Sequence, residues 1–318
     1  MKRFFGGLVL LAACGSVPDN THPPDAPHED AAPPMDGPDI DAAPPPPRCD
    51  PSKPFGTPTK VDALDIANAN DMHVALSQDE LTLVFASDRA GGQGLFDIYT
   101  STRGSQAAPW SAPTPLTLNT PGDETRPTLS ADQLSLFATY RPTPNSSYLV
   151  ERATRGSTSE AFGPLSSVNI VNAVAGNYDP FVTPDLSAIY FTSNRNSGTN
   201  GEDIYVATGN ASGFSTPTPV VGTSLDTVDD ETNPVVTPDQ LNLYFRSDRG
   251  GANQLDVWYA SRASMATGFG TPVNLSAVNT TASETPAWIS ADNCVLYFAR
   301  TVGTTAAFYD IFVVEKPL

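Results

Sequence analysis

Apolar and polar positions along the chain alternate in short runs that recur about every fifty residues. Each run follows a Ser/Thr-x-Asp turn, and in the run at 241–245 large apolar side chains alternate with smaller or polar ones. Such alternation is typical of a pleated strand packed between neighbours. A period near fifty that is built from short strands indicates a β-propeller blade rather than a helical solenoid. Spacings of 53, 53, 54 and 53 residues separate the turn aspartates, which are Asp79, Asp132, Asp185, Asp239 and Asp292.

Each repeat is expected to contain four strands. In the fourth repeat we place the first three at 234–237, 241–245 and 256–260. An Asp-aliphatic-aromatic triplet marks the third strand in four repeats, beginning at Asp97, Asp203, Asp256 and Asp310. The outer strand follows an aromatic residue that has a proline within three residues, at Phe55, Trp110, Phe162, Phe214 and Phe269.

The two ends of the repeat region decide the number of blades. Only six residues follow the triplet 310–312, which are too few for an outer strand. The segment 55–58 supplies an outer strand that no inner strands precede. We therefore predict an all-β, five-bladed propeller of four-stranded antiparallel blades over residues 51–318. An N-terminal outer strand completes the last blade, which closes the ring and removes its open edges.

Two cysteines lie at this predicted closure. Cys294 opens the second strand of the last blade, and Cys49 lies six residues before the closing outer strand. In a meander these two positions are on the same face of a blade, so we predict a disulfide between them in an oxidising compartment. The alternative is two unpaired thiols, one of them a small buried apolar side chain.

The N-terminus has the features of an export signal. Lys2 and Arg3 precede an apolar stretch that ends in Leu11-Ala12-Ala13-Cys14 and is too short to cross a bilayer. A cysteine after the small pair resembles the bacterial lipobox, which implies cleavage before Cys14 and a diacylglycerol on its sulfur. We expect residues 1–13 to be a lipoprotein signal peptide, and Gly15 indicates the outer membrane. An ordinary signal peptide with an incidental cysteine is the alternative.

Residues 14–50 have the composition of a tether. Eleven prolines and seven carboxylates lie between Gly15 and Arg48, with hardly an aliphatic side chain larger than alanine. Such a segment cannot bury enough apolar surface to offset the entropy of ordering, so it is expected to stay extended. At roughly 3.1 Å per residue in a polyproline conformation, it could hold a domain up to about 100 Å from a membrane.

Charge and composition narrow the classes of partner. The chain has 35 acidic and 17 basic residues, a formal charge of −18, and contains 23 glycines and 31 prolines. Binding to nucleic-acid phosphate requires Lys/Arg clusters that this chain lacks, so no nucleic-acid partner is expected. The abundance of glycine and proline argues against a helical bundle.

Several repeat motifs carry a family resemblance. Ser-Asp-Arg occurs at 87–89 and 247–249, and Asp-Ile-Tyr at 97–99 and 203–205. Over roughly residues 55–318 these motifs resemble the WD-repeat-like propeller blades of TolB and related periplasmic proteins. The resemblance implies a propeller that binds a protein on one face. TolB carries an N-terminal α/β domain that binds its translocation partners, and here a leader and a tether replace it. The second repeat departs from the pattern at 139–141 and 148–150.

One further position recurs eight residues before each turn aspartate. Since the strand before the turn lines the channel of a propeller, we expect this position to form an acidic ring at one mouth. Two interpretations stay open. The recurring arginines Arg89, Arg195 and Arg249 neutralise the ring, or the ring binds Ca²⁺ or a cationic group, for which oxygen-rich rings are suited. The ring position holds Asp71, Glu124, Asn177, Glu231 and Glu284.

Residues that occur once are better candidates for chemistry than repeated ones. Trp288 occupies a position of the inner strand that holds smaller residues elsewhere, and it could stack on a sugar or peptide, with core packing as the alternative. His73 is the single histidine of residues 51–318, and we expect it to line the channel or pack rather than act as a base. No Gly-x-Ser-x-Gly or His-Glu-x-x-His motif is present.

Together these patterns favour a monomeric, lipid-anchored propeller of the bacterial cell envelope. We expect a non-catalytic module that binds an envelope protein or a glycan, contacts the membrane through its lipid and needs no cofactor apart from the Ca²⁺ interpretation. The alternative is a carbohydrate-active or other hydrolytic propeller that uses channel carboxylates.

Overall fold

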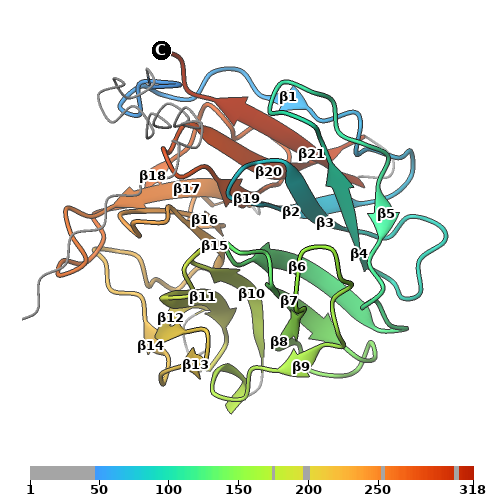
Figure 1. Cartoon of the computed structure of the whole chain (residues 1–318). Coiled ribbons are helices and arrows are strands. Elements are labelled where there is room, and N and C mark those ends of the chain that lie inside the picture. Colours follow the sequence, from blue (N-terminus) through green and yellow to red (C-terminus); the bar gives the residue numbers. More distant parts are fainter. Residues whose placement is uncertain (1–46, 174–175, 196–200, 252–254, 304–307) are drawn as a thin grey trace, which may run out of the picture. The chain divides into compact units, whose positions relative to one another are not determined.

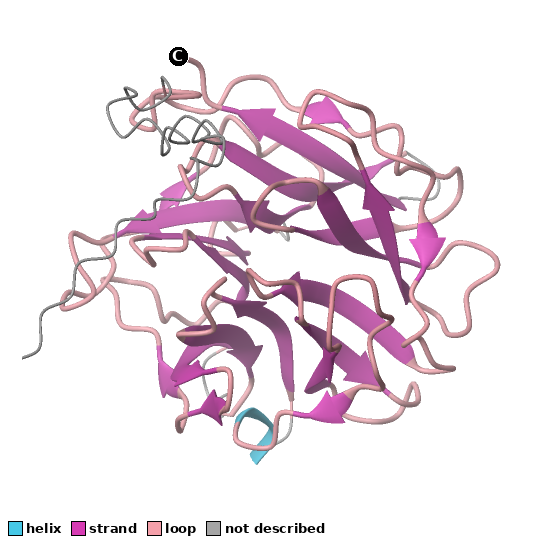
Figure 2. Ribbon diagram, viewed as in Figure 1, coloured by secondary structure: helices cyan, strands magenta, loops and turns pink. Residues whose placement is uncertain are grey.

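The computed structural model describes residues 47–173, 176–195, 201–251, 255–303 and 308–318. These residues fold into five antiparallel sheets arranged around a common centre (Figure 1). Apart from one short 3₁₀ helix, η1 (Val171–Ala173), the regular structure consists of strands (Figure 2). The expected all-β, five-bladed propeller is confirmed. Cys14, the leader 1–13 and most of the tether 14–50 lie outside the described residues.

The first three blades follow the chain from the inner to the outer strand. Blade 1 contains β2 (Asp71–Leu76), β3 (Thr82–Ser87), β4 (Asp97–Thr102) and β5 (Thr114–Pro115). Blade 2 contains β6 (Asp123–Leu129), β7 (Ser135–Arg141), β8 (Leu149–Thr154) and β9 (Ser166–Ser167). Blade 3 contains β10 (Asn177–Val182), β11 (Ala188–Ser193), β12 (Asp203–Asn210), β13 (Gly213–Phe214) and β14 (Thr218–Pro219).

The last two blades complete the ring. Blade 4 contains β15 (Glu231–Val236), β16 (Asn242–Ser247), β17 (Asp256–Ser261) and β18 (Val273–Asn274). Blade 5 contains β19 (Glu284–Ile289), β20 (Val295–Val302), β21 (Phe308–Glu315) and, from the other end of the chain, β1 (Thr59–Lys60).

The repeated aspartates form the turns between the first two strands of each blade. In blade 1 the Asp79 carboxylate accepts hydrogen bonds from the Leu81 amide at 3.0 Å and from the Ser77 hydroxyl. The carboxylates of Asp132, Asp185, Asp239 and Asp292 likewise accept the amide two residues on. This side-chain bond replaces a backbone bond in the turn, which explains why the Ser/Thr-x-Asp pattern recurs.

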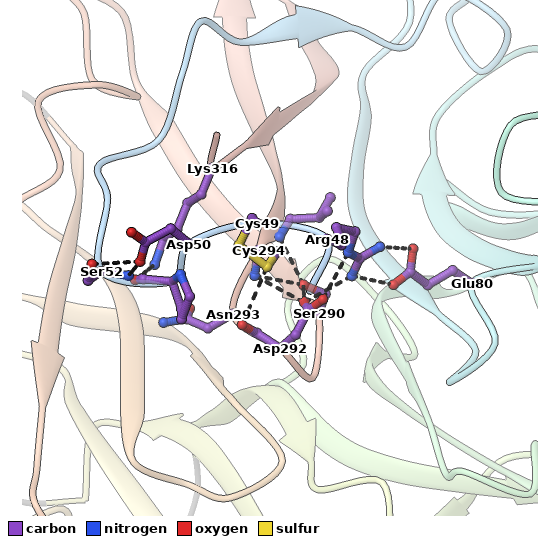
Figure 3. Close-up of a disulfide and its surroundings, with 12 residues drawn as sticks. Arg48, Cys49, Asp50, Ser52, Glu80, Ser290, Asp292, Asn293, Cys294 and Lys316 are labelled. Atoms are coloured by element: carbon purple, nitrogen blue, oxygen red, sulfur yellow. Dashed lines mark hydrogen bonds and ion pairs between the residues drawn. A yellow bond between two sulfur atoms is a disulfide. The ribbon is translucent and has the colours of Figure 1, made fainter. Parts of the chain in front are cut away.

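The ring closes between the two ends of the described chain, as predicted. β1 pairs antiparallel with β21, with Thr59 opposite Val313 and Lys60 opposite Phe312. Nearby, Cys49 and Cys294 form the predicted disulfide, with their Cα atoms 5.8 Å apart (Figure 3). Both cysteines are buried. The covalent link therefore ties the segment before β1 to the start of β20.

Polar contacts reinforce this closure. The Arg48 guanidinium donates to Glu80 of blade 1 at 2.8 Å and to Asp292 of blade 5 at 2.9 Å (Figure 3). The Lys60 ammonium lies 2.5 Å from Asp310 on β21. The hydrogen bonds to Asp292 and Glu80 raise the pKa of Arg48 above its usual value, so its guanidinium is charged at all ordinary pH values. No helix among the described ranges is long and apolar enough to cross a membrane.

Candidate functional site

Each inner strand contains one residue more than the strand beside it. In blade 4, Thr232 pairs with Arg246 and Val235 with Tyr244, so three steps on β15 face two on β16. The same shift occurs in all five blades. Such a bulge bends the strand and changes the direction in which its side chains point. The inner strands therefore do not keep one alternating face along their whole length.

The bulge residues surround the centre of the propeller. Four of them have a left-handed backbone, with φ between 53° and 58°, and the fifth is a proline. Positive φ is uncommon outside glycine and is enriched at binding and catalytic sites. All five line a central space of about 30 Å³, which has room for about one water molecule. These residues are His73, Arg126, Asp179, Asn233 and Pro286.

An ion pair occupies this centre. The Arg126 guanidinium contacts the Asp179 carboxylate, and the carboxylate is almost fully buried. Asp179 also accepts a hydrogen bond from the Thr192 hydroxyl at 2.9 Å and one from the Asn233 amide at 3.2 Å. These bonds offset the cost of burying the charge. Asp179 is therefore held firmly in place and is not available as a free carboxylate.

His73 is the second unusual group at the centre. It is 8% exposed, and neither ring nitrogen has a hydrogen-bond partner among the described residues. Burial, together with the positive charges of Arg126 and Arg246, holds the pKa of His73 well below its usual value. The imidazole is therefore neutral and has one donor and one acceptor unused. The expectation that His73 lines the channel is confirmed.

A cavity of about 560 Å³ opens above this centre on the side of blades 1 to 3. His73, Arg126 and Asp179 line both the cavity and the central space. Its size falls within the range of small-ligand sites, about 300–1,000 Å³. Further lining comes from the inner-strand ends and from loops, including Met72, Phe96, Thr125, Gly176 and Asn194.

Aromatic rings and a second ion pair form one wall of the cavity. Tyr148 and Tyr178 lie with their ring centroids 5.5 Å apart. The Arg141 guanidinium lies 4.8 Å from the centroid of Tyr148 and also pairs with Asp123. This wall combines flat apolar faces with hydrogen-bonding groups. Blade 2 supplies Tyr148 and Arg141 at the positions where its sequence departs from the other repeats.

Glu202 contributes the remaining carboxyl group of the cavity. It precedes β12 and is half-buried. Burial raises the pKa of Glu202, while its hydrogen bond with the Tyr178 hydroxyl acts in the opposite direction. Each carboxylate that lines the cavity therefore has a partner. Asp123 and Asp179 form ion pairs with arginines, and Glu202 forms a hydrogen bond with the Tyr178 hydroxyl.

The structure places the five expected ring residues inside the blades. All are at most 1% exposed, and none lines the cavity or the central space. Arg89 pairs with Asp71, Arg249 with Glu231 and Arg300 with Glu284, at distances of 2.6 to 2.8 Å. Arg195 donates to the Asn177 side chain at 2.8 Å. The interpretation in which arginines neutralise the position therefore describes blades 1, 4 and 5, whereas blade 3 has an uncharged asparagine there.

Glu124 is the exception in this set. Blade 2 has Tyr140 opposite it, and Arg141 pairs with Asp123 instead. Within the described ranges, Glu124 accepts hydrogen bonds only from the amide and hydroxyl of Thr120. Because burial is not offset by a cation, the pKa of Glu124 rises to about 7.

Trp288 lies elsewhere than the cavity. It lines a small apolar space of about 40 Å³ in the channel, together with residues of the turns between inner and second strands. Its ring lies edge-on to Tyr297 with centroids 6.0 Å apart. Trp288 is half-buried and packs against two core clusters, which agrees with the alternative that it serves core packing. Its proposed stacking role stays a prediction.

The residues of the candidate site share a sequence signal. Each bulge residue lies six positions before the turn aspartate, and this position holds five different residue types. The position two residues earlier is more regular, with an acid in four of the five repeats. Among the described residues no group of three His, Cys, Asp or Glu side chains could hold a metal ion.

No protein-family model and no curated protein matches the chain. Solved structures share its fold at low identity. An endo-arabinase from Bacteroides thetaiotaomicron is 12% identical with a TM-score of 0.56, over 83% of this chain and 97% of that chain. A family 117 glycoside hydrolase from Zobellia galactanivorans is 11% identical with a TM-score of 0.55, over 83% and 90%. TolB from Acinetobacter baumannii is 13% identical with a TM-score of 0.49, over 78% of this chain and 55% of that one. The likenesses to the endo-arabinase and to the family 117 enzyme show a shared fold.

Proposed function

We propose that this protein is a lipid-anchored, extracytoplasmic propeller that binds a glycan, without cleaving it, in the cavity above its channel. The observation that carries the proposal is the cavity of about 560 Å³ itself. The disulfide between Cys49 and Cys294 supports an oxidising, extracytoplasmic compartment. The sequence around Cys14 supports the lipid anchor.

The lining of the cavity suits a sugar better than a protein surface. Sugar rings have one apolar face and a rim of hydroxyl groups, so they need flat apolar surfaces beside hydrogen-bonding groups. Tyr148 and Tyr178 supply such faces, and Arg141 and Glu202 supply the polar groups. Two of the structural neighbours, the endo-arabinase and the family 117 enzyme, are named as enzymes that act on glycans.

The state of the carboxylates supports binding without hydrolysis. Glycosidases use a pair of carboxyl groups that flank the bond to be cleaved. Here Asp123 and Asp179 each pair with an arginine, which restricts their movement. That leaves Glu202 as a lone group.

The proposal is tested by screening the purified protein on a glycan array. We expect selective binding that Tyr148→Ala lowers at least about tenfold, because stacking on the aromatic wall is lost. Val273→Ala, which truncates an exposed side chain on the outer strand of blade 4, is the matched control and should bind as wild type does. Absence of binding to any glycan would refute the proposal.

A second function has one observation in its favour. The raised pKa of Glu202 is a property of a general acid in glycoside hydrolysis. The glycans that bind should therefore also be incubated with the protein and assayed for new reducing ends. We expect none. If new reducing ends appear with the wild-type protein and Glu202→Gln abolishes them, the protein is a glycoside hydrolase rather than a binding module.

A further inference from the structure

One position of the repeat lines the cavity from three neighbouring blades. It directly precedes the third strand of each blade, and strand pairing makes Asp97, Leu149 and Asp203 equivalent as the first residues of those strands. The residues at this position in blades 1 to 3 are Phe96, Tyr148 and Glu202, and all three line the cavity. Two aromatic side chains and one carboxyl group therefore contribute to the cavity from equivalent places.

The fold uses only the backbone of this position. Its carbonyl accepts a hydrogen bond from the first amide of the next inner strand in blades 1, 3 and 4, at 2.6 to 2.9 Å. The side chain is aromatic or aliphatic in four blades and is a carboxylate in blade 3 alone. A carboxylate costs more to bury than an apolar side chain, so the fold gives no reason for Glu202. The five residues in blade order are Phe96, Tyr148, Glu202, Leu255 and Tyr309.

Glu202 is also the carboxylate of the cavity that has no cation beside it. The other charged side chains of the lining form two ion pairs, Arg126 with Asp179 and Arg141 with Asp123. Arg246 acts on Glu202 through space, but it does not line the cavity and forms no ion pair within the described ranges. Segments 174–175, 196–200, 252–254 and 304–307 contain no lysine or arginine. The ionised cavity lining therefore has one negative charge in excess.

We infer that the glycan bound in the cavity contains an amino sugar with a free amino group, and that the Glu202 carboxylate binds its ammonium. This inference rests on the proposed function and names the class of sugar. An ammonium donates short, charge-assisted hydrogen bonds to a carboxylate. Phe96 and Tyr148 line the same cavity, and aromatic faces both stack on sugar rings and attract cations.

Two further properties of the protein agree with a cationic ligand. Burial raises the pKa of Glu202, and a cation bound beside it favours the charged form again. The chain has a formal charge of −18, so its long-range field attracts cations and repels anions.

The test compares the same oligosaccharides with and without their positive charge. Oligosaccharides of glucosamine and of galactosamine are titrated into the purified protein, beside the same oligosaccharides after N-acetylation of every amino group. Cello-oligosaccharides, which have a hydroxyl in place of each amino group of the glucosamine series, control for the bulk of the acetyl group. We expect a free-amine form to bind at least about tenfold more tightly than its neutral counterparts, and this preference to fall with added salt.

Variants of the carboxylate assign the preference to Glu202. Glu202→Gln should remove the preference without weakening the binding of the acetylated forms, and Glu202→Asp should retain part of it. Glu315→Gln, which removes an exposed carboxylate at the end of β21, is the matched control and should keep the preference. A thermal melt checks that each variant is folded.

The outcomes separate this inference from the proposed function. Binding of neutral glycans alone would overturn the inference and leave the proposed function standing, whereas absence of all glycan binding would overturn both. Spermidine is a polyamine without a sugar ring. If it binds as tightly as the amino sugars, the net charge of the chain explains the preference and the inference is wrong. A preference that survives Glu202→Gln would overturn the role of Glu202.

Discussion

At the scale of single residues, the propeller repeats one buried contact between an arginine and the inner strand and omits it once. Arg249 over Phe245 and Arg300 over Phe298 each place a guanidinium on an aromatic ring while pairing with the acid of the inner strand. In blade 2 the cation pairs one residue earlier, with Asp123, and Glu124 is left with neutral donors. The buried acid of blade 2 therefore lacks the arginine that pairs with Asp71, Glu231 and Glu284 in other blades.

Glu124 gives the protein a pH-dependent stability. Its pKa of about 7 when folded is above the ordinary 4.5, so the folded protein retains a proton that the unfolded chain releases. The stabilisation from this group is complete below pH 4.5 and is lost as the pH rises through 7. Glu124→Gln keeps a hydrogen-bond acceptor without the charge. We expect it to raise the free energy of unfolding by about 2 kcal/mol at pH 8 and to have little effect at pH 5.

Urea denaturation at the two pH values measures this difference. Glu231→Gln is the matched control, because it occupies the same position in blade 4 but pairs with Arg249. It should destabilise the protein at both pH values, since it leaves the arginine without its carboxylate. Equal effects of Glu124→Gln at pH 5 and pH 8 would contradict the assignment of a raised pKa.

At the scale of elements, the sequence predicts strands and turns well because they repeat. The Ser/Thr-x-Asp turns, the third-strand triplets and the closing strand all follow from spacing. The inner strands are harder. In blade 4 the predicted strand 234–237 proves to be β15, Glu231–Val236, with a bulge at Asn233. A one-residue insertion reverses which side chains face the channel. Glu231 is therefore buried in its blade, and Asn233 lines the channel instead.

The cavity could not be predicted because its parts come from places where the repeat is broken. Glu202 and Gly176 belong to connecting segments, and Tyr148 directly precedes Leu149, which replaces the repeated aspartate. Alternation and spacing describe what blades share and say nothing about such departures. The disulfide was predictable for the opposite reason, because closure of the ring brings two fixed strand positions together.

The closing strand depends on its side-chain links. β1 contributes only two paired residues, so its backbone bonds alone hold it weakly. The Cys49–Cys294 bond closes a loop of 245 residues, for which chain-entropy models give about 5 kcal/mol. We expect the double variant Cys49→Ala/Cys294→Ala to unfold with a free energy lower by about 2–5 kcal/mol, measured by guanidinium denaturation.

A reducing agent provides the control for this prediction. Wild-type protein under reducing denaturation should match the double variant, whereas the double variant itself should not respond to the reductant. Free-thiol labelling of the oxidised wild-type protein should detect neither Cys49 nor Cys294. Equal stability of the oxidised and reduced wild-type protein would show that the bond adds nothing to closure.

At the scale of the whole molecule, we propose that the tether and the lipid on Cys14 hold the propeller near a membrane. Cys14→Ser is expected to move the protein from the membrane fraction to the soluble fraction of the cell envelope, because the acylated sulfur is lost. Membrane fractionation with immunoblotting measures the shift. The variant is best made in the Tyr148→Ala background, in which glycan binding is expected to be weakened, so that a bound glycan does not retain it. Unchanged membrane retention in that background would contradict the anchor.

The pairing of β1 with β21 also determines how long the newly made chain waits before its propeller can close. Thr59 is synthesised 254 residues before Val313, its partner in the sheet. At 5–20 residues per second, the first strand waits roughly 13–50 s before its partner exists. Until then the nascent propeller is an open arc with two unpaired edges, and each edge can add a strand from another chain. Because the strand order leaves these edges unpaired until β21 is made, the edges must be shielded from other chains during biosynthesis.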